Sequence, residues 1–314
     1  MVPDAVLREQ IPNSLPETDF SFGSRYKGKV RDNYTVNSER VIVVTDRISA
    51  FDIVLTTLPF KGQVLNQLAA FWFAKTKSLV PNHVIDVPDP NVTIAKECTP
   101  IAVEMVVRAY LTGVTTTSAW YHYQQGVRNF CGNVLPNDMR KDQQFDEPIL
   151  TPSTKAQHGH DVSVSKQEIL SSGVVDKDMF DSMEEASFRL FEFGSRFAEK
   201  RGLVLVDTKY EFGICDGELM LIDEIHTPDS SRYWFQDEYE IRFARGEEQK
   251  SFDKEYVRKW LAQHGFTGTG APPAIPDDVR VEAAKRYIAA YEAVTGERFT
   301  TAPGDVRQRV ELHP

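Results

Sequence analysis

The stretch from Leu203 to Trp234 reads LVLVDTKYEFGICDGELMLIDEIHTPDSSRYW, and it predicts two strands whose ends carry many charged side chains. Asp207, Lys209 and Glu211 lie two residues apart, so on an extended strand their side chains share one face. Placing charged groups against a sheet costs free energy unless they are paired or bind a ligand. The pattern therefore indicates either a solvated ladder of ion pairs or, as we favour, a site for a metal ion and a polyanionic ligand.

The turn between the two strands decides whether Asp223 joins this charged face. A two-residue type I′ turn at Asp216-Gly217 would place Asp223 on the face opposite Glu211, whereas a three-residue loop over Cys215–Gly217 would place both carboxylates on the same face. We predict the three-residue loop. Glu211 and Asp223 would then favour a hard cation, with Mg²⁺ and phosphate oxygens as the natural combination. Lys209, between them, would neutralise a phosphate.

The segment TPDSSRYW follows the second strand and carries groups suited to an anion. Arg232 can grip an anion with its planar fork and Ser231 can donate a hydrogen bond to it, while Asp229 can orient its neighbours. A plain turn that happens to contain Ser and Arg is the competing interpretation.

Composition limits the classes of function. The chain has 314 residues, enough for two or three modules, with 41% hydrophobic and 26% charged residues. Its formal net charge of -10 disfavours bulk attraction to nucleic acid or to an anionic membrane, so anionic ligands must be drawn in by local Lys and Arg. Three cysteines without CxxC spacing suit a reducing compartment. Without a signal pattern or an apolar run of roughly 20 residues, a cytoplasmic location is expected.

Periodicity along the chain predicts an α+β fold. A hairpin is expected around a turn at Asn37-Ser38, a helix over Gln63 to Leu79 and a buried strand over Ile101 to Leu111. The polar segment from Pro136 to Ser165 is expected to be a long loop, either functional or mobile. A helix should end at Gly202, and the chain beyond residue 246 should be mostly helical.

Seven motifs, taken in order, resemble those of the phosphoribosylaminoimidazole-succinocarboxamide synthase (SAICAR synthetase) family. They run from Tyr26 to Trp234 and read YKGKVRDNY, VVTDRISAFD, KGQVLNQ, VEMVVRAYLTG, TPSTKAQHGHD, LVLVDTKYEFG and LIDEIHTPDSSRYW. The resemblance implies an α+β fold related to the ATP-grasp and kinase-like nucleotide binders, with the helical C-terminal extension of the long, yeast-like form. It also implies an ATP-phosphate domain over 1–105, a central domain with the metal and substrate site over 106–245, and a helical region over 246–314.

The same resemblance implies the reaction. The family is a carbon–nitrogen ligase of purine biosynthesis that joins L-aspartate to the carboxylate of carboxyaminoimidazole ribotide (CAIR) at the expense of ATP, with Mg²⁺, and an acyl phosphate is the expected intermediate. Three anions must then share one site, which requires Mg²⁺ and several Lys and Arg. The expected partners are these small molecules, without nucleic acid or membrane. The long form implies a monomer, with a homodimer as the alternative.

The resemblance also assigns residues to the nucleotide and its metal ion. The GKVR turn resembles the ATP phosphate loop, although an exposed hairpin would explain the same residues. Met105 fits a position in the core as well as a contact with adenine. The residues implied for the nucleotide are Lys29, Arg31, Glu104, Met105, Lys209 and Glu211, and those implied for Mg²⁺ are Glu211 and Asp223.

Residues for the ribotide and for catalysis follow in the same way. A family serine should come directly after the glycine of LTG, but Val114 occupies that position, and we carry the role to Ser118. The residues expected to bind substrate are Arg108, Ser118, Asp207, Asp229, Ser231 and Arg232. Those expected to act in catalysis are Lys209 together with Lys155, His160 and Asp161 of the polar segment, where His160 is a candidate for proton transfer or a bystander. Asp46, Ser49 and Asp52 also match the family, and a structural cap is an equal reading of Asp46.

Two other functions compete with this one. A small-molecule kinase on a related fold would need Mg²⁺ and Lys209 but no aspartate pocket. A catalytically silent nucleotide-binding module would bind ATP without turnover, which the intact set of carboxylates and basic residues disfavours.

Overall fold

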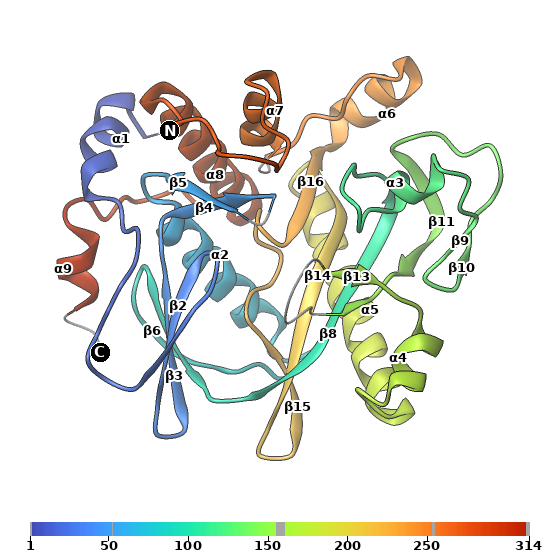
Figure 1. The fold of residues 1–314 in the computed structure, drawn as a ribbon, viewed down its shortest axis with the longest axis horizontal. Coiled ribbons are helices and arrows are strands. Elements are labelled where there is room, and N and C mark those ends of the chain that lie inside the picture. Colours follow the sequence, from blue (N-terminus) through green and yellow to red (C-terminus); the bar gives the residue numbers. More distant parts are fainter. Residues whose placement is uncertain (1, 52, 155–160, 253–254, 312–314) are drawn as a thin grey trace.

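The computed structural model describes residues 2–51, 53–154, 161–252 and 255–311. Two antiparallel sheets form its centre, and helices pack on them and around one end (Figure 1). The fold is therefore a mixture of helices and antiparallel strands, as the α+β prediction requires.

The N-terminal sheet contains the predicted hairpin. Asn37 has a φ of 56°, in the left-handed region that a tight turn between strands requires. The strands lie in the order β1 (Ser24–Lys27), β2 (Arg31–Val36), β3 (Glu39–Val44), β7 (Val92–Lys96) and β6 (Val84–Asp89), and a separate pair follows, β4 (Arg47–Ala50) with β5 (Ile53–Thr57).

The second sheet is built on two long strands, β8 (Thr99–Leu111) and β14 (Leu203–Cys215). Both β15 (Glu218–Ile222) and β16 (Ser231–Phe235) pair with the other edge of β14, one at each end. The loop between β15 and β16 therefore comes back to the middle of β14, where the backbone N–H of Lys209 donates to the carbonyl of Ser230 at 3.0 Å.

The hairpin β14–β15 has a two-residue turn, so the predicted three-residue loop is wrong. Cys215 pairs with Glu218 and Glu211 pairs with Ile222. Asp216 and Gly217 have φ values of 52° and 82°, and an Asp-Gly pair reaches this doubly left-handed geometry of a type I′ turn at low cost.

The polar segment 136–165 is more ordered than the predicted long loop. It contains β11 (Gln143–Leu150), β12 (Ser153–Thr154) and β13 (Val162–Ser163), and the first two pair with the free edge of β8. The reason is that a central strand leaves hydrogen-bonding groups on both edges, and this segment satisfies one of them. Residues 155–160 lie outside the described ranges.

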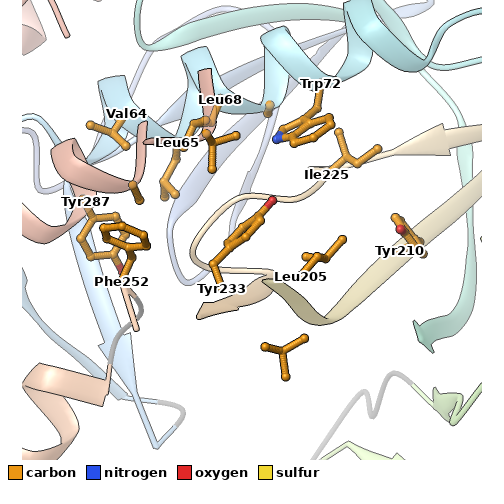
Figure 2. Close-up of a cluster of buried hydrophobic side chains, with 14 of the residues drawn as sticks. Val64, Leu65, Leu68, Trp72, Leu205, Tyr210, Ile225, Tyr233, Phe252 and Tyr287 are labelled. Atoms are coloured by element: carbon orange, nitrogen blue, oxygen red, sulfur yellow. The ribbon is translucent and has the colours of Figure 1, made fainter. Parts of the chain in front are cut away.

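Helices cover the apolar faces of the sheets. The amphipathic helix α5 (Lys177–Glu199) lies on the face of β8 and β14 opposite the charged row, and α2 (Lys61–Thr76) packs between the N-terminal sheet and α8 (Asp277–Thr295). Figure 2 shows the core between them, with Trp72 and Tyr233 among its largest side chains. The remaining helices are α1 (Asp4–Gln10), a 3-10 turn (Ile11–Asn13), α3 (Ala119–Tyr123), α4 (Lys166–Ser172), α6 (Gln236–Arg245), α7 (Glu255–Gln263) and α9 (Val306–Val310), and two short strands, β9 (Asn129–Phe130) and β10 (Asn133–Val134), form a hairpin.

The helices predicted beyond residue 246 are present as α7, α8 and α9. In the described ranges, no helix combines the length and the apolar character needed to cross a bilayer.

His83 should make the fold sensitive to acid. Burial lowers the pKa of His83 to about 3, and its Nε2 has no hydrogen-bond partner among the described residues. The unfolded chain takes up this proton near pH 6.5, so stability present above pH 6.5 is lost as the pH falls toward 3. Between pH 7 and pH 5, the free energy of unfolding of His83→Leu should fall by roughly 2 kcal/mol less than that of the unsubstituted chain, measured by urea denaturation. The exposed His264→Leu is the control, and equal pH dependence in both variants would contradict the assignment.

Candidate active site

The predicted row of charged side chains on β14 faces a matching row on β8. Asp207 pairs with Arg108 and Glu211 pairs with Glu104 across the two strands, so alternate residues of both strands share one face. Lys209 lies between them and binds Glu104 Oε1 at 2.7 Å and Glu211 Oε1 at 2.6 Å through its Nζ. The expectation that Asp207, Lys209 and Glu211 share a face is confirmed.

Lys209 remains a cation in this environment. Burial alone would lower its pKa, but Glu211 and Glu104 outweigh this effect and raise the pKa well above its ordinary value. The two carboxylates are almost fully covered, with 8% and 10% of their side chains exposed. Such a group is stable only as a balanced set, and a polyanion that approaches it must compete for Lys209.

Asp223 reaches the same site by a route other than the predicted one. The observed register alone would place it on the opposite face from Glu211, but β15 ends at Ile222 and Asp223 turns with a φ of 70°. Burial raises the pKa of Asp223 and nearby Glu211 raises it further, while Arg31 and Lys209 lower it, so the carboxylate lies within electrostatic reach of Glu211. The left-handed residue therefore turns Asp223 out of the strand register, and its carboxylate meets Arg31.

Arg31 joins the N-terminal sheet to this acidic group. Its Nη1 lies 2.9 and 3.0 Å from the two carboxylate oxygens of Asp223, and its Nη2 lies 2.8 Å from Glu224 Oε2. No group of three or more His, Cys, Asp or Glu in the described residues is arranged to hold a metal ion by itself. A cation here would need ligand oxygens besides those of Glu211 and Asp223, which is how Mg²⁺ usually binds beside phosphates.

Two arginines occupy the other end of the charged face. Asp207 Oδ2 accepts from Arg232 Nη1 at 2.6 Å and from Arg108 Nη1 at 3.4 Å. Arg108 is held further by Thr151 Oγ1 at 2.8 Å and by the carbonyl of Thr117 at 2.9 Å. One carboxylate between two guanidinium groups leaves a net positive charge, so this end is suited to an anion.

Ser118 lies beside these arginines, whereas Val114 does not point into the site. Ser118 is 1% exposed and its Oγ lies 2.7 Å from Thr115 Oγ1, while Val114 is 55% exposed. Gly113 has a φ of 90°, and a Cβ on it would lie 2.4 Å from Ser118 Oγ and 3.0 Å from Arg232 Nη1. The turn therefore packs Gly113, Ser118 and Arg232 together, which supports the transfer of the family serine's role to Ser118.

A cavity of about 330 Å³ opens on the charged face of β8 and β14. Ten of the predicted residues line it: Lys29, Ser49, Glu104, Arg108, Ser118, Asp161, Asp207, Lys209, Asp229 and Arg232. A larger cavity of about 770 Å³ lies between β11 and the helices α4 and α5, but it contains none of the predicted residues. The chemistry of the lining therefore selects the smaller cavity as the candidate site.

The remaining predicted residues lie around this cavity or outside the described ranges. Arg31, Glu211 and Asp223 form the group described above, and Ser231 bonds to Thr208 at 2.7 Å and lines a smaller adjoining cavity. The Met105 side chain is fully buried in the core, so an adenine contact there depends on its backbone. Lys155 and His160 lie outside the described residues, as does Asp52.

Arg258 carried no recognisable signal in the sequence, whereas a structural cap was one of the two readings of Asp46. Arg258 of α7 lines the cavity beside Arg232, although α7 is distant from it along the chain. Asp46 acts as a structural cap: its carboxylate accepts from the backbone N–H groups of Leu15 at 2.7 Å and Gly62 at 2.8 Å. Burial raises the pKa of Asp46 to about 6. These roles depend on distant partners that no local motif encodes.

Comparison with known proteins identifies the family of the chain. The family model described as SAICAR synthetase matches residues 24–272. The chain is 47% identical over 308 residues to a phosphoribosylaminoimidazole-succinocarboxamide synthase of Legionella pneumophila, covering 96% of this chain and 98% of the relative. It is 46% identical to a chloroplastic protein of the same name from Arabidopsis thaliana, covering 95% of this chain and 74% of the relative. A solved structure of SAICAR synthase from Saccharomyces cerevisiae complexed with SAICAR superposes with a TM-score of 0.80 at 31% identity, covering 92% of this chain and 100% of that one. The chain therefore belongs to the SAICAR synthetase family.

Proposed function

We propose that the cavity on β8 and β14 binds the reactants of the family's reaction, in which ATP drives the joining of L-aspartate to CAIR. The chain catalyses this ATP-dependent ligation of purine biosynthesis, as its family does. The observation that supports this placement of the reactants is that the charged face of β8 and β14 carries different groups at its two ends. One end gathers carboxylates and cations around Lys209, and the other holds the arginine pair on Asp207.

The reaction needs activation because a carboxylate is a poor target for an amine. Transfer of the terminal phosphoryl group of ATP to the CAIR carboxylate would give an acyl phosphate and ADP. The aspartate amine would then attack the carbonyl carbon, the C–O bond to phosphate would break, and the amine would lose a proton. The protein's contribution would be mainly to position three anions and to stabilise their charge.

The nucleotide would lie at the Lys209 end. Lys29 lines the cavity from the turn between β1 and β2, and Arg31 and Lys209 already contact the acidic group. Glu211 and Asp223 would hold Mg²⁺, which when bound neutralises phosphate charge. With these carboxylates on the cation, Lys209 and Arg31 would be available to the phosphate oxygens. Glu104 and the backbone of Met105 would lie along the adenine.

The ribotide would lie at the arginine end. Arg108, Arg232 and Ser118 converge there, with Ser231 beside them, and Asp207 accepts hydrogen bonds from both guanidinium groups. Asp161, which lines the cavity, places one end of the polar segment at the site. This supports roles for Lys155 at a substrate carboxylate and for His160 with Asp161 at the aspartate amine.

We further propose that the protein is a monomer and that it acts in the cytoplasm. We also propose that the chain is divided into three units, over residues 1–105, 106–245 and 246–314. β8 runs from Thr99 to Leu111 and so passes through the first of these boundaries. The arginine pair with its neighbouring serines, together with the family, favours the ligase over a kinase acting on a hydroxyl group.

Turnover should require all three substrates. Phosphate release from Mg-ATP by the purified chain should depend on both CAIR and L-aspartate and should yield SAICAR, identified by mass spectrometry. ATP hydrolysis at the same rate without CAIR would contradict the proposal, and phosphorylation of an alcohol would favour the kinase.

Asp223→Asn should lower kcat with Mg-ATP by on the order of 10²–10³, because the amide cannot supply the charge that holds the cation. Asp216→Asn, at the exposed tip of the same hairpin, is the matched control and should keep normal activity. Steady-state rates across a range of Mg²⁺ concentrations measure the difference, and a near-normal Asp223→Asn rate would remove Asp223 from the metal site.

Gly113→Ala should raise the KM for CAIR about tenfold or more while the KM for ATP stays nearly unchanged, since the added methyl group would displace Ser118 and Arg232. Gly126→Ala is the control, because Gly126 also has a φ of 90° but a Cβ there would meet nothing within 4 Å. Equal effects of the two substitutions would attribute the loss to backbone strain alone.

A further inference from the structure

Three buried polar side chains from distant parts of the chain meet at the edge of the cavity. Lys61 Nζ lies 2.8 Å from Asp229 Oδ2, and the Tyr287 hydroxyl donates to Asp229 Oδ1 at 2.6 Å. The Lys61 ammonium also lies 5.1 Å from the centre of the Tyr287 ring. Lys61 begins α2, Asp229 lies between β15 and β16, and Tyr287 belongs to α8, where Figure 2 shows it in the core with Val64 and Phe252.

Burying the ion pair of Lys61 and Asp229 costs free energy, which a purely structural role would not explain. The Lys61 side chain is 0% exposed and the Asp229 side chain 4%. The positive end of a helix disfavours a cation, and Lys61 is the first residue of α2. A buried ion pair seldom stabilises a fold more than apolar side chains of the same volume would. Its position beside the cavity therefore points to a role in the site.

Asp229 is well placed to set the geometry of that site. It lines the cavity with Ser230 and Arg232. The residues that follow Asp229 are fastened to the middle of β14, since the Ser230 carbonyl accepts from the Lys209 backbone N–H and Ser231 bonds to Thr208. A shift of Asp229 would consequently strain these bonds and move Arg232, which comes next in the chain and lines the same cavity.

The charge of Asp229 also matters, because every proposed reactant of this cavity is an anion. A bare carboxylate on the wall would repel the ribotide. Lys61 neutralises this charge from the side of the core, and the Tyr287 hydroxyl holds the second oxygen, so the carboxylate is kept in one orientation.

We propose that Lys61 and Tyr287 are positioning residues for the ribotide half of the site, acting through Asp229. This rests on the proposed function, because it assigns Asp229 to the CAIR end of the cavity. It also gives α8 a part in substrate binding, because the Tyr287 hydroxyl of this C-terminal helix holds Asp229 on the core side of the cavity.

The test is Tyr287→Phe in the full-length chain, which keeps the ring and removes only the hydroxyl. The KM for CAIR should rise about 5–10-fold, within the range expected for the loss of one hydrogen bond, while the KM for ATP and the melting temperature change little. Tyr291→Phe is the matched control, because Tyr291 lies one turn further along α8 and packs on Phe299. It should leave all three quantities unchanged.

A double-mutant cycle with Asp229→Asn separates positioning from bracing. In the Asp229→Asn background, Tyr287→Phe should change the KM for CAIR less than about twofold, because both substitutions break the same link. An unchanged KM for CAIR in Tyr287→Phe would overturn the proposal, and so would a parallel loss for all substrates with a lower melting temperature. Failure of the unsubstituted chain to require CAIR would instead refute the proposed function, before the variants are compared.

Discussion

The strands β8 and β14 pair antiparallel between Asp207–Ile214 and Thr99–Arg108, and this register brings the charged side chains of the site together. Because side chains alternate along a strand, the pairing of Glu104 with Glu211 and of Arg108 with Asp207 fixes one polar face and one apolar face. The apolar face packs against α5, and that packing holds the register in place. A slip of one residue would turn Lys209 into the core and Tyr210 into the cavity, so packing and chemistry are specified by the same constraint.

The other parts of the chain are attached to this strand pair through charged contacts. Arg31 joins the N-terminal sheet to Asp223 and Glu224. On the opposite side, α7 contributes Arg258 to the cavity and α8 contributes Tyr287 through Asp229. The site is therefore assembled from three sections of the sequence, and the C-terminal helices supply part of its wall.

Local patterns in the sequence predicted those features that depend on neighbouring residues. The spacing of Asp207, Lys209 and Glu211 was sufficient to predict their common face, and periodicity located α2, α5 and α8. The turn at Asp216-Gly217 was assigned wrongly, because two turn lengths fit the same letters and only the pairing distinguishes them. The outcome for Asp223 depended on a single left-handed residue, which the strand pattern does not reveal.

Features that depend on distant partners were beyond the sequence. β11 and β12 form because β8 offers them an open edge, and the polar composition of 136–165 does not show this. Arg258 appeared as an ordinary helix residue, and Lys61 stood in the motif KGQVLNQ without an assigned role, until the fold placed Arg232 and Asp229 beside them. Ser118 could be chosen only through the family resemblance, and its contact with the Gly113 turn supports that choice.

The most direct measurement is a crystal structure of the chain with a non-hydrolysable ATP analogue and Mn²⁺ in place of Mg²⁺, with the ion located by its anomalous scattering. The account predicts one ion bound to carboxylate oxygens of both Glu211 and Asp223 and to phosphate oxygens, at about 2.0–2.2 Å, with Lys209 and Arg31 turned to the phosphates. An ion located elsewhere, with Glu211 still on Lys209 and Asp223 still on Arg31, would contradict it.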